Sequence, residues 1–393
     1  MMLDLFQDQI PLLRPWLGEE EIQAVAEVLR SGWICQGPKV MEFEQALAGW
    51  IGVKQGVATN ACTSSLHLAL HLSGVRAGDE VIVPSFTCMA TANAIHHAGA
   101  RPVFADIDPQ TFNIDARSAE QAITPRTKAL LVVHQIGLPA DISAFQELAH
   151  RKNLAIVEDG ACSLGATYRG RRVGALGSPT CFSFHPRKMI TTGEGGLIAT
   201  NDAELARKAR VLRSTGASSS DLERHHAKGT LVQQYAEVGY NYRMTDLQAA
   251  IGVVQLRKLD AMVRERAAQA KHYDAQFRDV EEVETPYVPE GSTHAYSSYL
   301  VRLRDHCPVD RDDLLSLLAS AGISCRVGIQ PLHHEPFYRE EWGQTVLPHT
   351  EEAARNTLLL PIFPGLRTDQ QDQVVSAIKN AMVAAKRKSE VLV

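Results

Sequence analysis

The sequence has no long hydrophobic run, no surplus of basic residues and no cysteine pair at a metal-binding spacing. Its apolar runs, such as Ala129–Val133, are far shorter than the roughly 20 residues that span a bilayer. Lys and Arg number 40 against 45 Asp and Glu, which gives a net charge of −5. The short apolar runs lead us to expect no membrane span. Because binding to a phosphate polymer needs clustered positive charge, we also expect no nucleic-acid partner.

The cysteines do not form a disulfide framework. There are seven of them, an odd number, scattered from Cys35 to Cys325, which is typical of a reduced protein. No CxxC or zinc-finger spacing occurs, so we expect no metal site. The first residues, Met1–Asp4, lack a basic segment followed by an apolar stretch. We therefore expect no signal peptide and a cytoplasmic location.

The middle of the chain alternates between short apolar runs rich in Val and Ile and amphipathic helical stretches. Such alternation predicts an α/β fold with a mainly parallel sheet covered by helices on both faces. Ligands of such sheets bind at the carboxyl ends of the strands. The expected strands are 80–83, 102–105, 129–134, 154–158, 180–184 and 197–200, and the expected helices between them are 64–74, 91–98, 116–122 and 140–152.

The flanking segments predict a second, smaller domain. At 393 residues the chain is long enough for two or three domains, and we expect a large domain over 1–250 and a small α+β domain over 251–393, divided within a long helix. The polar stretch 216–229 is expected to be a mobile loop. The other expected helices are 19–31, 40–50, 204–212, 246–273, 311–321, 350–358 and 368–386, with strands at 296–303 and 324–327.

Two residues next to predicted strand ends have the chemistry of a pyridoxal phosphate (PLP) site. Lys188 follows the strand 180–184 on a turn that Pro186 begins, and a lysine held there can form a Schiff base with an aldehyde cofactor. Asp159 ends another strand, and PLP needs an acidic partner for its ring nitrogen. Taken alone, a lysine on such a turn is more often simply solvated, and an aspartate at a strand end is more often an ordinary cap.

A third element could hold the phosphate of the same cofactor. Thr63 and Ser64 lie at the start of a predicted helix, where free N–H groups, hydroxyls and the helix dipole attract anions. Ser183 could add a further hydroxyl. A Thr-Ser pair is by itself usually an N-cap. In the chain order phosphate site, Asp and Lys, however, the three elements together describe one cofactor.

With these motifs in place, the chain resembles the nucleotide-sugar aminotransferases of the DegT/StrS type, which are fold-type I PLP enzymes. The resemblance covers nearly the whole length of the chain. It is carried by Arg14-Pro15, Glu19–Ile22, Ser31–Trp33, Gly78–Thr87, Asp106–Asp108, His134 with Gly137, Glu158-Asp159, Phe182–Gly196, Gly239–Met244, Leu247–Ala250 and Leu360–Pro364.

The resemblance implies roles for individual residues. Lys188 would form the internal aldimine and shuttle the proton, and Asp159 would face the pyridine nitrogen. Thr63, Ser64 and Ser183 would bind the phosphate. Asn241 would reach the phosphate from a neighbouring subunit, which implies a homodimer with a shared active site.

The chain departs from the family pattern at two cysteines. Cys88 stands where relatives often place an aromatic ring on the cofactor, and Cys162 stands where they commonly have Gln or His. We expect both thiols to face the cofactor and to pack against it as small apolar groups.

Four further residues are candidates for contact with the substrate. His185 is either a substrate contact or a turn residue that satisfies backbone groups. Trp33, Arg326 and His333 match regions that line the sugar-nucleotide cleft in relatives. His333 could equally be an interior residue, and Arg326 could form a structural ion pair.

The expected activity is transamination of a nucleotide-linked keto sugar with L-glutamate as the donor. The Thr-Thr-Gly-Glu-Gly-Gly form at 191–196 is similar to relatives acting at a C4 ketone, which favours a 4-keto-6-deoxyhexose. Some relatives replace the lysine with His and catalyse dehydration, so Lys188 favours transamination. Two alternatives remain: a PLP-dependent sugar dehydratase or keto-cyclitol aminotransferase, and a regulatory or sensory protein that kept the fold.

Overall fold

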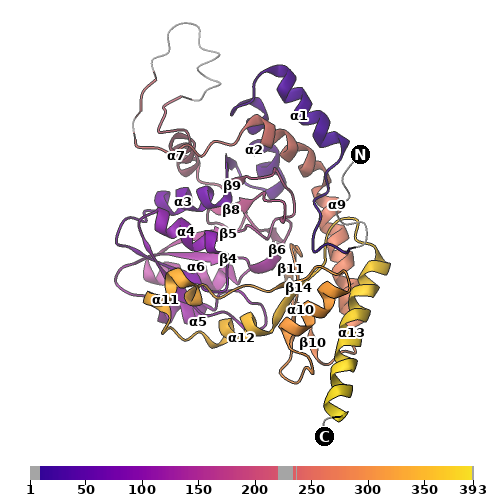
Figure 1. Cartoon of the computed structure of the whole chain (residues 1–393). Helices are drawn as coiled ribbons and strands as arrows, with labels where there is room; N and C mark the ends of the chain where they lie inside the picture. Colours follow the sequence, from indigo (N-terminus) through magenta and orange to yellow (C-terminus); the bar gives the residue numbers. More distant parts are fainter. Residues whose placement is uncertain (1–8, 220–232, 236, 392–393) are drawn as a thin grey trace.

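The protein is built around a seven-stranded sheet with helices on both faces (Figure 1). The structure is a computed structural model that describes residues 9–219, 233–235 and 237–391. Six of the seven strands are parallel and β9 is antiparallel to both of its neighbours, which confirms the mainly parallel sheet. In spatial order the strands are β1 (Gln55–Thr59), β9 (Gly196–Thr200), β8 (Thr180–Ser183), β5 (Ala155–Asp159), β4 (Thr127–Val133), β2 (Glu80–Pro84) and β3 (Arg101–Ala105).

The two faces of this sheet bury separate apolar cores. Successive side chains of a strand point to opposite faces, so Ile82 of β2 enters one core while Val81 and Val83 enter the other. On the first face lie α2 (Pro38–Ile51), α5 (Ala116–Gln121), α6 (Ile142–Lys152) and the first half of α9 (Asp246–Phe277). On the second face lie α3 (Cys62–Leu72), α4 (Met89–His97) and α7 (Ala203–Arg213).

The expected helices and strands of this domain are present within a few residues of their predicted ends. Within the seven-stranded sheet the exception is β1, which was not predicted and which pairs antiparallel with β9. Helix α1 (Glu19–Ser31) has the predicted bounds, and short elements complete the domain: η1 (Gln135–Gly137), β6 (Thr167–Tyr168) and β7 (Arg171–Arg172). Most of the predicted loop 216–229 lies outside the described residues.

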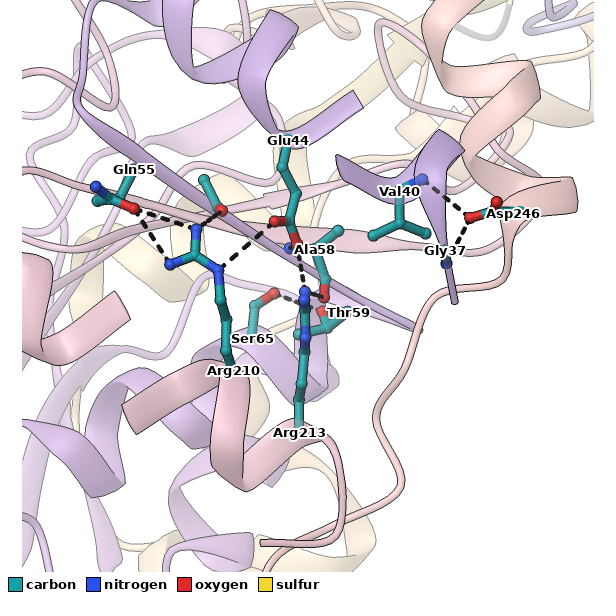
Figure 2. A network of polar contacts seen from close by, with 11 residues as sticks. Gly37, Val40, Glu44, Gln55, Ala58, Thr59, Ser65, Arg210, Arg213 and Asp246 are labelled. Atoms are coloured by element: carbon teal, nitrogen blue, oxygen red, sulfur yellow. Dashed lines mark hydrogen bonds and ion pairs between the residues drawn. The ribbon is translucent and has the colours of Figure 1, made fainter. Parts of the chain in front are cut away.

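A buried ion pair fastens the β1 edge of the sheet (Figure 2). The guanidinium of Arg213, at the end of α7, donates to the Glu44 carboxylate of α2 and to the carbonyl oxygen of Ala58 at 2.5 Å. Glu44 also accepts the Ala58 N–H at 2.8 Å. Arg210, one turn earlier on α7, donates to the side chain of Gln55 at 3.1 Å. The charges buried here are therefore both paired and hydrogen-bonded, as burial of charge requires.

A second buried carboxylate holds the start of α2. Asp246, the first residue of α9, is 2% exposed. It accepts the N–H groups of Gly37 at 2.8 Å, Val40 at 3.0 Å and Lys39 at 3.1 Å (Figure 2). Burial raises the pKa of this carboxyl, and the backbone N–H donors act in the opposite direction. One side chain thus serves as the cap for a helix more than 200 positions away.

The C-terminal part of the chain forms a second sheet, which is entirely antiparallel. Its order is β10 (Val283–Glu284), β12 (Tyr299–Leu303), β14 (Thr357–Leu360) and β13 (Arg326–Val327). Helices α10 (Arg311–Ser320) and α13 (Thr368–Val391) pack on it, together with the second half of α9. A short strand, β11 (Ser292–Thr293), pairs with β6. The division of the chain at residue 250 stays a prediction, since α9 contributes to the cores of both sheets.

The predicted helix 350–358 is wrong at its C-terminal end. Helix α12 runs over Pro348–Asn356, and Thr357–Leu360 is a strand between β12 and β13. A short apolar run such as Leu358–Leu360 does not distinguish helix from strand by its pattern. Pairing on both sides therefore decides its structure. The connection before α12 contains η2 (Leu332–His334) and α11 (Pro336–Trp342), neither of which was predicted.

Segments from the C-terminal part also pack against the large sheet. Asp106 follows β3 and accepts N–H groups of His349 at 3.1 Å and Thr350 at 2.8 Å, so it caps α12. Tyr338 of α11 packs edge-on against Phe104 of β3. The helices of the described ranges include none long and apolar enough to cross a membrane.

The capping role of Asp246 leads to a stability prediction. Asp246→Ala leaves three N–H groups at the start of α2, those of its N-cap Gly37 and of Lys39 and Val40, without their acceptor. We therefore expect the free energy of urea unfolding to fall by about 2 kcal/mol or more. Asp279→Ala, at an exposed position, is the control and should change it by less than roughly 0.5 kcal/mol. Equal effects of the two substitutions would contradict the role given to Asp246.

Candidate active site

Lys188 lies on a tight turn between β8 and β9. The turn closes because Phe184, which follows β8, accepts the N–H of Thr192 at 3.0 Å and donates its own N–H to Gly195 at 2.9 Å. Within it, Lys188 donates its N–H to the His185 carbonyl at 2.8 Å. The backbone around Lys188 is thus fixed by hydrogen bonds on both sides, and its side chain is directed to the carboxyl edge of the sheet.

The Lys188 amine contacts Cys162. Nζ donates to Sγ at 3.1 Å. Burial acts to lower the pKa of Lys188, but Cys162, Asp159 and Cys88 favour the charged amine, and the net effect is a raised pKa. The amine must lose its proton before it can react with an aldehyde.

Asp159 ends β5 and is held from two sides. Its side chain is 4% exposed; Oδ2 accepts the hydroxyl of Thr91 at 2.8 Å and Oδ1 accepts the N–H of Ala161 at 3.0 Å. Thr91, on the first turn of α4, was not among the predicted site residues. The sequence carries no signal for it beyond a polar residue on an apolar helix, because its partner is 68 positions away.

A cavity of about 690 Å³ lies between the large sheet and the C-terminal sheet. Five of the predicted site residues line it together: Cys88, Asp159, Cys162, Lys188 and Arg326. Residues that were not predicted complete the wall, among them Leu12, Leu13, Gln135 and Ser297. Both cysteines therefore line the same cavity as the lysine and the aspartate, and their contact with the cofactor stays a prediction.

The cavity opens toward two guanidinium groups. Arg187 and Arg326 are exposed and line both this cavity and an adjoining one of about 520 Å³, which shares Leu12, Leu13 and Cys325 with it. Arginine binds phosphate oxygens in bidentate fashion. The approach to Lys188 can therefore accept a ligand that carries phosphate groups.

The start of α3 provides a site for an anion. Its N-cap residue, Ala61, makes no side-chain capping hydrogen bond. The N–H groups of Cys62, Thr63 and Ser64, in the first turn, have no intrahelical partner, as at any helix N-terminus. The strand register aligns Thr59 of β1 and Ser183 of β8 on either side of Gly196. A Cβ on Gly196 would lie 2.6 Å from the Ala61 carbonyl, so only glycine lets β9 approach α3 this closely.

The hydroxyls of Ser64 and Ser183 each take part in a local hydrogen bond. Ser64 donates to the Asn60 side chain at 2.7 Å, and the Ser183 hydroxyl accepts the His185 N–H at 3.4 Å. Asn241 is exposed, and its carbonyl accepts the Asn60 amide at 3.4 Å. Asn241 is thus anchored beside the loop that leads into α3, and a contribution to a second subunit stays a prediction.

Three of the predicted substrate residues, all within the described ranges, do not line the cavity: Trp33, His185 and His333. The indole N–H of Trp33 donates to the Gln36 carbonyl at 3.2 Å, in the segment before α2. His185 accepts the Arg187 N–H at 3.2 Å, and burial lowers its pKa. These contacts match the alternative interpretation of His185 as a turn residue.

The structure corrects the expectation that His333 lines the substrate cleft. Its side chain is 0% exposed, and Nδ1 lies 2.7 Å from the Ser85 hydroxyl. His333 is thus the interior residue of the second interpretation. Its position between β2 and α12 depends on a contact across 248 positions.

These groups fit PLP at each of its functional ends. The uncapped α3 N-terminus suits the phosphate, the Asp159 carboxylate suits the ring nitrogen, and the Lys188 amine suits the aldehyde. The three belong to different elements, which the carboxyl edge of the sheet brings together.

Comparison with known proteins points to the same cofactor. The profile of the DegT/DnrJ/EryC1/StrS aminotransferase family matches residues 15–379. The spore coat polysaccharide biosynthesis protein SpsC of Bacillus subtilis is 39% identical over 380 residues, which are 96% of this chain and 98% of that protein.

Two solved structures show the same fold. One is PseC of Helicobacter pylori, an aminotransferase involved in the biosynthesis of pseudoaminic acid, with a TM-score of 0.89 and 28% identity over 96% of this chain and 100% of that chain. The other is the PLP form of the putative sugar aminotransferase Spr1654 from Streptococcus pneumoniae, with a TM-score of 0.89 and 29% identity over 96% of this chain and 99% of that chain.

The contact between Lys188 and Cys162 predicts a shift in the pH dependence of PLP loading. Cys162→Ala removes a group that raises the pKa of Lys188, so we expect this pKa to fall. The unprotonated amine then forms at lower pH, and the rate of PLP loading should reach its half-maximum at a lower pH.

The measurement is the rate at which apoenzyme develops a visible absorption band after addition of PLP, followed across pH. Cys35→Ala, at an exposed position, is the control. A midpoint that stays the same or moves upward in Cys162→Ala would rule out this influence of the thiol.

Proposed function

The chain belongs to the DegT/DnrJ/EryC1/StrS aminotransferase family, and on that premise we propose that it transfers the amino group of L-glutamate to a nucleotide-linked keto sugar. As a family member it is a PLP-dependent sugar aminotransferase of fold type I. The proposal adds the donor, the nucleotide and the sugar, a 4-keto-6-deoxyhexose. The observation that supports it most is that Lys188 and Asp159 line one cavity with the arginine Arg326 on its wall.

The residues around the cavity divide the work of transamination. When bound, PLP supplies an aldehyde that takes up the amino group and a ring that withdraws electrons. Thr63, Ser64 and Ser183 would hold its phosphate. The Asp159 carboxylate, fixed by Thr91 and the Ala161 N–H, would keep a proton on the ring nitrogen.

Lys188 would act as the general base and acid. Once neutral, its Nζ would take the proton from the Cα of the amino donor and pass it to the aldehyde carbon of the cofactor. In the second half-reaction it would move a proton in the opposite direction, to the sugar carbon that receives the amino group. The site handles donor and acceptor in turn at the same lysine, so we expect ping-pong kinetics.

The nucleotide part of the proposal rests on Arg187 and Arg326. Their two guanidinium groups at the junction of the two cavities suit a diphosphate. The choice of C4 rests on the resemblance at 191–196. Thr191 and Thr192 donate their hydroxyls to the carbonyls of Phe184 and Glu194, so this pair shapes the Lys188 turn and would affect the sugar through the turn.

We also propose that the working unit is a cytoplasmic homodimer in which Asn241 completes the partner's phosphate site. In support, Asn241 is exposed and anchored beside the loop into α3. All seven cysteines fall in described ranges, and none of them is in a disulfide, as in proteins of reducing compartments.

The activity is tested by the two half-reactions. Purified protein with PLP should show a visible absorption band, glutamate should bleach the band with release of 2-oxoglutarate, and a keto-sugar nucleotide should then restore it. Lys188→Ala should remove both the band and turnover, whereas Lys54→Ala, at an exposed position, should retain both.

The products separate the alternatives. Mass spectrometry with a panel of keto-sugar nucleotides and keto-cyclitols distinguishes an amino product from a dehydrated one. A colourless protein that does not bind added PLP would refute the proposal, and failure to form 2-oxoglutarate with every acceptor would favour the regulatory alternative.

The role of Arg326 leads to a separate prediction. Arg326→Ala removes a guanidinium from the cavity wall, so KM for the nucleotide-linked sugar should rise about tenfold, as expected for loss of a charge-assisted contact. The glutamate half-reaction should keep its rate. Arg355→Ala, on α12, is the control; an unchanged KM in Arg326→Ala would exclude contact with the substrate.

A further inference from the structure

Outside the cofactor cavity, two histidines and a glutamate converge between η2 and α12. We call His333, His334 and Glu351 the His–His–Glu cluster. One ligand atom from each lies within 4.8 Å of the others. Imidazole nitrogen and carboxylate oxygen are the ligands of many zinc sites. The function proposed above uses none of these three side chains.

His333 presents a nitrogen with an unused lone pair or proton to this cluster. Its side chain is 0% exposed, and Nε2 has no hydrogen-bond partner among the described residues. The other ring nitrogen, Nδ1, lies 2.7 Å from the Ser85 hydroxyl. In the tautomer in which Nδ1 donates to the Ser85 oxygen, Nε2 is the acceptor and the ring is oriented, as in most metal-ligating histidines.

The backbone holds His333 in place independently of its ring. The Ser85 hydroxyl accepts the His333 N–H at 3.1 Å, and the Ser85 carbonyl accepts the Leu332 N–H at 3.0 Å. Ser85 follows β2 directly, so the buried ligand is tied to the large sheet. A site built this way does not have to be ordered when an ion binds.

Glu351 is positioned from the opposite side. Its Oε1 lies 3.6 Å from Nε2 of His333 and accepts the Leu347 N–H at 3.0 Å, at the start of α12. Helix α12 is itself fixed by the capping contacts of Asp106. The carboxylate therefore faces the orphan nitrogen from a helix that cannot easily move away.

We propose that the His–His–Glu cluster binds one divalent transition-metal ion of the zinc class. Two imidazoles and one carboxylate favour Zn²⁺ over Ca²⁺ and Mg²⁺, which prefer oxygen ligands. His334 is exposed, so its ring can rotate to bring the three ligand atoms to bonding distance of one ion. A water molecule would fill the fourth coordination position of the ion and would enter from the solvent-exposed side on which His334 lies.

Such an ion would link η2 to α12. Residues 327–330, just before η2, line the cofactor cavity, so the ion would fix the end of that wall from outside. The expectation of no metal site rested on the spacing of the cysteines. The histidine cluster gives no such local signal, because His333 and His334 are adjacent and Glu351 follows 17 positions later in the chain.

The test titrates holoenzyme, freed of metal by a chelator and then of the chelator, with ZnCl₂ by calorimetry. Co²⁺ serves as a second probe through its visible ligand-field band. We expect one ion per chain. His334→Ala and Glu351→Gln should each weaken binding more than about tenfold, since even outer-shell partners contribute about ten- to a hundredfold.

Matched control residues lie on α12, the helix that carries Glu351. His349→Ala and Glu352→Gln remove an exposed imidazole and a carboxylate of α12 and should leave the affinity unchanged. Thermal unfolding without metal checks that all four variants are folded. Lack of binding in the wild type, or wild-type affinity in both His334→Ala and Glu351→Gln, would overturn the proposal and leave a plain His–Glu contact.

Discussion

The parallel pairing of β5 between β4 and β8 is the constraint on which the site depends. Asp159 is aligned with Val133 on one side and Cys181 on the other. Its neighbour Glu158 points to the opposite face, where it is fully buried against His134 at 2.8 Å. Side chains alternate along a strand, so a slip of one residue would exchange the two carboxylates. The register of β5 therefore decides which of them serves the cofactor.

The two main functional groups depend on different kinds of structure. Asp159 is placed by strand register, whereas Lys188 is placed by a turn whose carbonyl and N–H groups are paired through Phe184, Thr191 and Gly195. Asp159 and Lys188 must share one cavity. They can do so because the strands that precede them, β5 and β8, end at the same edge of the sheet. The general rule that ligands of parallel sheets bind at the strand ends thus has a concrete cause here: a strand residue and a turn residue meet where the two strands stop.

How much the sequence could predict follows from how local each signal is. Periodicity predicted the parallel strands other than β1 and most helices. Motif order predicted that Asp159 and Lys188 lie together, and the family resemblance placed Cys88 and Cys162 beside them. Strands β1 and β14 and the site residue Thr91 were among the features missed, and His333 was given an interior alternative but no partner. Thr91 and His333 depend on partners 68 and 248 positions away, and β14 depends on pairing with β12 and β13. Contacts of that range are decided by packing and leave no local pattern.

The carboxyl edge of the large sheet has a second use, which explains why the cavity lies beside the C-terminal sheet. Ser85 follows β2 and binds His333, and Asp106 follows β3 and caps α12. Asp159 ends β5 at the same edge and faces the cavity. Polar residues at three strand ends thus hold both the cofactor side and the opposing wall. A rigid sheet fixes the distances between strand ends, so the wall that carries Arg326 is set relative to Asp159 by the same sheet that positions the aspartate.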